Sequence, residues 1–163
     1  MALSRLAQMG EIRRVGRGVY DRPKVHAILG ELPADPAQVA EAIARTDGAS
    51  LVPSGSLAAN ALGISTQVPA KLIFRTTGGT RRVKVGGSTI ELRHSTPGRL
   101  RARDRTAATV FEALRSLGQN GVTPRVIEAL RRRLSAKERA QIAKAAPDAP
   151  AWMHPHLREL ANA

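Results

Sequence analysis

The stretch ALSRLAQMGEIRRVGRGVY, residues 2–20, decides the predicted fold. Residues 2–9 have the apolar spacing of a short amphipathic helix, and Gly10 ends it. Residues 11–20 predict a basic β-hairpin, because Gly16 and Gly18 on either side of Arg17 supply the backbone freedom of a tight turn. A helix followed by a two-stranded ribbon with arginine at its tip is typical of the trailing half of a winged helix-turn-helix. Residues 12–20 are therefore the predicted wing.

This predicted winged helix is incomplete at its start. The motif needs further helices ahead of the recognition helix, and only Met1 precedes residue 2. We expect either a start codon placed too late or a natural remnant, and we favour the first because Met1 falls inside a helix. A helix this short is marginal alone in water, so we expect it to dock through Leu3, Leu6 and Ala7.

The composition points to a polyanionic partner. Lysine and arginine number 26 against 13 acidic residues, giving a net charge of +13. Aromatic residues make up 2% of the chain, which argues against binding single strands by base stacking. The chain has no cysteine, no apolar run long enough to span a bilayer and no signal-peptide core, so we expect a soluble cytoplasmic protein without a membrane partner.

The basic residues form three clusters along the chain. The first surrounds the wing, where the planar guanidinium groups of arginine suit phosphate. Arg17 is expected to enter a minor groove while Arg13 and Arg14 hold phosphates, with a solvated hairpin as the alternative. Polar residues of the first helix could reach a groove, and a role as solvent-exposed side chains is the open alternative. The predicted DNA-binding residues are Ser4, Arg5, Gln8, Arg13, Arg14, Arg17, Arg22 and Lys24. For the other two clusters a solvated surface is the alternative. The second cluster comprises Lys71, Arg75, Arg81, Arg82, Lys84, Arg93, Arg99, Arg101, Arg103 and Arg105. The third comprises Arg131, Arg132, Arg133, Lys137 and Arg139.

The rest of the chain alternates between strand and helix signals. A linker over residues 21–33 precedes a helix that begins at Pro36 with Asp35 as its N-cap. Residues 51–52 predict a short strand, and Ser54 is expected to cap a helix over 57–62. Strands over 71–76, 82–85 and 89–94, separated by glycine pairs, predict an antiparallel meander. Helices over 106–117 and 123–134, a third opened by a capping box at Ser135, and a short last helix complete the chain.

The fold class is therefore α+β. We expect a truncated N-terminal winged helix-turn-helix in residues 1–24. A small α/β domain with the meander and the C-terminal helices is expected over residues 34–163.

The order and spacing of several segments resemble the AbiEi-type antitoxin family of bacterial type IV toxin–antitoxin systems. More narrowly, they are similar to its small members of the DUF type, which have no known function. The segments are residues 4–6 (SRL), 16–20 (GRGVY), 51–55 (LVPSG), 60–63 (NALG) and 65–69 (STQVP). The resemblance implies a winged-helix transcriptional repressor that binds its own operator, with a C-terminal domain that counteracts a nucleotidyltransferase-like toxin. No catalytic activity is implied, and full members carry the helices that are missing here.

Two other functions remain open from the residues alone. The chain could be a protein-interaction module that neutralises the toxin, with DNA binding lost by truncation. Asp47 and Glu91 also form a faint pattern of a metal-dependent nuclease, although alternation within the strand explains Glu91. We expect no cofactor and no metal, since His154 and His156 have no cysteine or carboxylate pair to complete a site.

Overall fold

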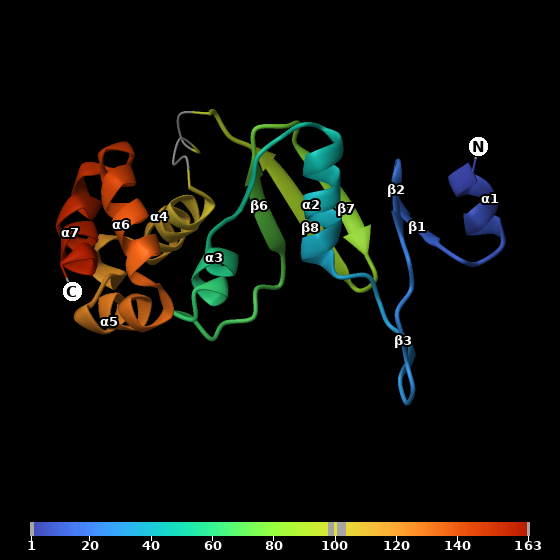
Figure 1. Cartoon of the computed structure of the whole chain (residues 1–163), viewed down its shortest axis with the longest axis horizontal. Helices are drawn as coiled ribbons and strands as arrows, with labels where there is room; N and C mark the ends of the chain where they lie inside the picture. The colour runs from blue at the N-terminus through green and yellow to red at the C-terminus, as the bar shows by residue number, and fades with distance from the viewer. Residues whose placement is uncertain (1, 98–99, 101–103, 163) are drawn as a thin grey trace.

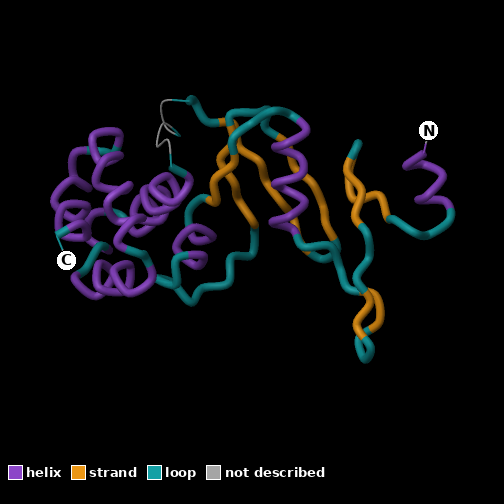
Figure 2. The backbone as a smooth tube through the Cα atoms, in the orientation of Figure 1, coloured by secondary structure: helices purple, strands orange, loops and turns teal. Residues whose placement is uncertain are grey.

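The computed structural model describes residues 2–97, 100 and 104–162. The chain is a mixed α+β protein in which short strands and helices alternate up to residue 94, whereas the described residues from 105 onward form helices and no strand (Figure 1, Figure 2). Arg99, Arg101 and Arg103 of the second basic cluster lie outside the described residues. No helix in the described part of the chain is long and apolar enough to cross a membrane.

The chain begins with the predicted helix and hairpin. Helix α1 (Ala2–Gln8) is followed by the antiparallel strands β1 (Arg13–Gly16) and β2 (Val19–Asp21). The expected docking of the helix is wrong: α1 contains no buried residue, and Leu3 is 52% exposed. A seven-residue helix has too little apolar surface to hold itself against the rest of the protein.

A second hairpin replaces the linker that the sequence predicted. Strands β3 (Val25–His26) and β4 (Gly30–Glu31) pair antiparallel, and the ribbon extends to a hydrogen bond from the Leu32 N–H to the Lys24 carbonyl at 2.7 Å. Gly30 has a φ of 70°, which a side chain would disfavour, and this conformation lets the chain return along β3. The two strands are too short to show a period-2 pattern in the sequence.

The central sheet has four strands, in the order β5-β6-β8-β7. Its strands are β5 (Leu51–Pro53), β6 (Leu72–Thr76), β7 (Arg81–Val85) and β8 (Ser88–His94). The predicted meander is wrong, because β8 lies between β6 and β7 and runs parallel to β6. The link after β6 passes the end of β8, where the His94 N–H donates to Thr80 Oγ1 at 2.9 Å. Only the β7–β8 pair is the hairpin that the glycine pattern predicted.

Helix α2 (Pro36–Thr46) covers one face of this sheet (Figure 1). Its N-cap is Asp35, as predicted, and its buried side includes Val39, Ala40 and Ile43. Ile90 and Leu92 of β8 point into the same core, and so does Val19 of the first hairpin. The β1–β2 hairpin is thus packed into the core of α2 and the sheet, while the predicted division between residues 24 and 34 stays a prediction.

The remaining helices form a second core. Buried residues of this core include Phe111, Leu114 and Ile142. The predicted capping box of Ser135 and Glu138 is confirmed. The elements are α3 (Ser56–Ala61), α4 (Arg105–Leu117), α5 (Pro124–Arg133), α6 (Ala136–Ala145) and α7 (His154–Ala161), with single turns of 3-10 helix at Gln119–Gly121, Ala146–Asp148 and Ala151–Met153.

Ser54 does not cap α3 as the sequence predicted. The N-cap is Gly55, with no side-chain cap, and Ser54 Oγ donates instead to Glu112 Oε2 on α4 at 2.9 Å. Glu112 is 3% exposed, forms an ion pair of 2.9 Å with Arg115, and lies 3.8 Å from Arg75 Nε of β6. This buried carboxylate therefore ties the helical core to the sheet.

Candidate nucleic-acid interface

The β1–β2 hairpin presents two arginines to solvent. Arg14 and Arg17 are exposed, whereas Val15 between them packs against the sheet core. The strand pairing is irregular between Arg14 and Gly16, which places Arg17 and Gly18 at the turn, where Gly18 takes a φ of 73°. The only hydrogen bond of these two side chains within the described residues runs from Arg14 Nε to the Gly16 carbonyl at 3.3 Å. Both guanidinium groups are therefore available to an anionic ligand.

Arg13 is engaged within the chain. Its guanidinium donates to Asp21 Oδ2 at 2.7 and 2.9 Å, to Glu31 Oε1 at 2.9 Å and to the Leu32 carbonyl at 2.7 Å. Two carboxylates balance its charge, and only 29% of its side chain is exposed. Arg13 thus fastens the first hairpin to the second, and its binding to a phosphate stays a prediction.

The other predicted DNA-binding residues all lie on the surface. Arg22 and Lys24 are exposed in the segment that joins the two hairpins. Ser4, Arg5 and Gln8 are exposed on α1, which has no buried side. The fold leaves each of these side chains accessible, and contact with DNA remains a prediction for every one of them.

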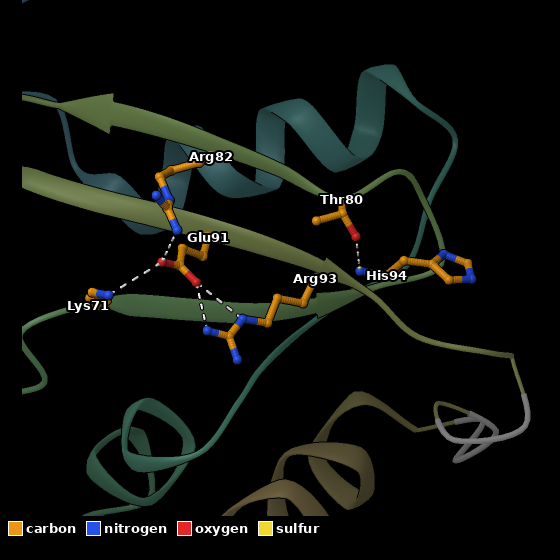
Figure 3. A network of polar contacts seen from close by, with 6 residues as sticks. All are labelled: Lys71, Thr80, Arg82, Glu91, Arg93 and His94. Carbon is orange, nitrogen blue, oxygen red and sulfur yellow. Dashed lines mark hydrogen bonds and ion pairs between the residues drawn. The ribbon is translucent and has the colours of Figure 1, made fainter.

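The sheet carries a second basic group, which we call the Glu91 cluster: Lys71, Arg82, Glu91 and Arg93 (Figure 3). Glu91 alternates with Ile90 and Leu92 and so lies on the face of β8 opposite α2. Its carboxylate is buried beneath three exposed cations. Arg93 binds Oε2 at 2.7 Å, Arg82 binds Oε1 at 3.0 Å, and Lys71 Nζ lies 3.8 Å from Oε1.

The electrostatics of this cluster are fixed by its shared carboxylate. The hydrogen bond from Arg93, with the nearby charges of Arg82, Arg93 and Lys71, holds the pKa of Glu91 below its ordinary value of 4.5. Glu91 therefore stays ionised at neutral pH, and three cations against one anion leave a positive surface with two ordered guanidinium groups. Such groups bind phosphate through paired N–H donors. The alternation along this strand of the sequence indicated that Glu91 and Arg93 share a face. It could not place Arg82 beside Glu91, because that position depends on the register between β7 and β8.

Glu91 and Asp47 do not share a site. Asp47 follows the last residue of α2, where its carboxylate binds Arg81 at 2.7 Å, whereas Glu91 faces the other side of the sheet. Within the described residues no three side chains of histidine, aspartate or glutamate are grouped to hold a metal ion. This geometry gives the nuclease pattern no support.

Within the third basic cluster, Arg131 and Arg139 bind backbone carbonyls of the helices, while Arg132, Arg133 and Lys137 are exposed. Arg131 donates to the Glu159 carbonyl of α7, and Arg139 donates to the Leu134 carbonyl at 3.1 Å. Arg131 and Arg132 also lie 3.8 and 3.9 Å from Glu128 on the same helix. These contacts favour the solvated helix end over a ligand site, since cations also stabilise a helix C-terminus.

Comparison with known proteins gives one family. The family model described as "Family of unknown function (DUF6088)" matches residues 1–142. No curated protein matches the sequence significantly. The same holds for the solved structures.

Proposed function

Because the chain belongs to the DUF6088 family, whose function is unknown, we propose a role from the surface chemistry: DNA-binding autorepressor of its own operon. We further propose that it is the antitoxin of a type IV toxin–antitoxin system and not an enzyme. The observation that carries the DNA-binding proposal is the pair of exposed arginines, Arg14 and Arg17, on a short ribbon of a chain with net charge +13. The antitoxin role rests on the resemblance to the AbiEi family.

Duplex DNA is the ligand that suits this ribbon. Arginines on an exposed hairpin neutralise phosphates, and one at the tip suits the negative potential of a narrow minor groove. The Glu91 cluster supplies further cations on the sheet, so electrostatic docking extends beyond the hairpin. Autorepression also needs sequence recognition, and Ser4, Arg5 and Gln8 of α1 offer donors and acceptors for base edges.

A salt-dependent titration tests the DNA-binding proposal. Affinity is measured for the duplex upstream of the coding sequence and for a scrambled duplex. If about six phosphates are neutralised, the slope of log affinity against log salt is near −5. The double variant Arg14→Gln/Arg17→Gln should make this slope less steep by about 2. Arg132→Gln/Arg133→Gln removes the same charge from the third cluster and should leave the slope unchanged. A wild-type slope near zero, or equal effects of the two double variants, contradicts the proposal.

The antitoxin role is tested separately in cells. The chain is co-expressed with a neighbouring nucleotidyltransferase-like gene whose product arrests growth, and restored growth is the expected result. If growth is restored by a wild-type protein that binds neither duplex, the protein-interaction module replaces the autorepressor. Continued arrest in the presence of folded protein contradicts the antitoxin proposal.

A further inference from the structure

The β3–β4 hairpin carries solvent-exposed apolar side chains at its end. Ile28 and Leu29 in its turn are 87% and 72% exposed, and Val25 on β3 is 78% exposed. The hairpin projects away from the sheet and the helices (Figure 1, Figure 2). Ile28 and Leu29, which we call the apolar tip, thus lie in water at the end of a protruding ribbon, where apolar side chains are costly unless they meet a partner.

The tip is held in a defined conformation. His26 Nδ1 accepts hydrogen bonds from the backbone N–H groups of Ile28 and Leu29, at 3.2 and 3.3 Å. At the base of the hairpin, Arg13 binds both Glu31 and the Leu32 carbonyl. The ribbon is therefore fixed at both ends, and its apolar tip is presented at little further cost in conformational entropy.

The charges around the hairpin favour a polyanion. Arg22 and Lys24 are exposed just before β3, and the one carboxylate of the hairpin, Glu31, is already paired with Arg13. A protein partner is disfavoured by area. Stable protein interfaces bury about 800 Å² on each partner, and two aliphatic side chains at an isolated tip offer only a small part of that. A slot between stacked base pairs, with phosphates on both sides, matches a small apolar end with cations behind it.

We propose that Ile28 and Leu29 form a wedge that enters the minor groove of duplex DNA and separates two stacked base pairs. This inference rests on the proposed DNA-binding function. Aliphatic side chains inserted in this way partly unstack a base step, and pyrimidine–purine steps such as TpA yield most readily. Arg22 and Lys24 bind the phosphates that flank the opened step.

Fluorescence of 2-aminopurine tests the wedge. The adenine analogue replaces the adenine of a TpA step at successive positions in duplexes from the upstream DNA, and its emission rises when the base is unstacked. Wild-type protein should raise the emission at one position. The variant Ile28→Ser/Leu29→Ser should abolish that rise and weaken binding by about tenfold, without changing the salt slope, because it removes apolar contact and no charge.

Val68→Ser is the matched control, since Val68 is 89% exposed and lies outside the hairpin. It should behave as wild type in both assays. Salt-dependent DNA binding with no rise in emission at any position overturns the wedge alone. An unchanged rise in the Ile28→Ser/Leu29→Ser variant overturns it as well. If the wild-type protein shows no salt-dependent DNA binding at all, the proposed function is overturned, and the wedge with it.

Discussion

Replacing Glu112 tests how the sheet and the helical core are joined. The carboxylate is 3% exposed and is shared by Ser54, Arg115 and Arg75. Glu112→Ala removes a charge from between two arginines whose side chains are only 23% and 22% exposed. Removing one partner of a buried ion pair costs about 3–5 kcal/mol. Because both arginines keep some contact with water, we expect a loss near the lower end, about 3 kcal/mol of unfolding free energy.

Chemical denaturation followed by circular dichroism measures this loss directly. In a thermal experiment, about 3 kcal/mol corresponds to a fall in Tm of about 6–12 °C for a protein of this size. The control is Glu128→Ala, because Glu128 is half exposed and its arginine contacts are 3.8 and 3.9 Å, so we expect a change below about 0.5 kcal/mol. A Glu112→Ala variant as stable as this control would refute the reasoning that the buried carboxylate joins the two cores.

Three further predictions concern single positions. Ser135→Ala removes the capping box of α6 and should cost about 1 kcal/mol in denaturation, whereas Ser135→Thr keeps an acceptor and should be close to wild type. Gly78→Ala brings a Cβ to 3.0 Å from that of Ala49 and should destabilise the protein by about 1–3 kcal/mol; Gly79→Ala, with nothing within 4 Å, should not, and equal effects would contradict the packing at this turn. The hydrogen bond from Arg93 and the charges around Glu91 hold its pKa below 4.5, so its contribution to stability is present above pH 4.5 and is lost as the pH falls further. The Tm difference between wild type and Glu91→Gln should therefore shrink below pH 4.5, and a difference that widens there would show that the ion pairs do not stabilise the fold.

Local signals in the sequence were sufficient for several elements. Asp35 and Ser135 cap their helices as predicted, because a cap depends on residues only two or three positions away. The paired glycines between β7 and β8 gave the hairpin for the same reason. The similar glycine pair after β6, Gly78 and Gly79, lies in a link that leads past β8 to β7 and does not form a hairpin. The strand order depends on pairing between distant segments, which no local pattern encodes.

The polar contacts that the sequence did not reveal are also those made between distant residues. Ser54 has the local features of a cap, but its hydroxyl finds an acceptor in Glu112, 58 positions later. Arg13 and Arg14 are equivalent in the sequence, yet neighbouring side chains of a strand face opposite ways, and Asp21 and Glu31 lie on the side of Arg13. Sequence analysis could therefore predict which hairpin is basic, but not which of its arginines stay free for a ligand.

The placement of Val15 and Val19 in the sheet core has a consequence for how this protein can be divided. A fragment that starts at residue 34 would leave the apolar surface around Val83 and Val85 without its cover. A fragment of the first two dozen residues would in turn lose the contacts of Val15 and Val19 with that core. We therefore expect the basic hairpin and the sheet to unfold as one cooperative unit, so that a gene rearrangement that exchanged one would have to carry the other with it.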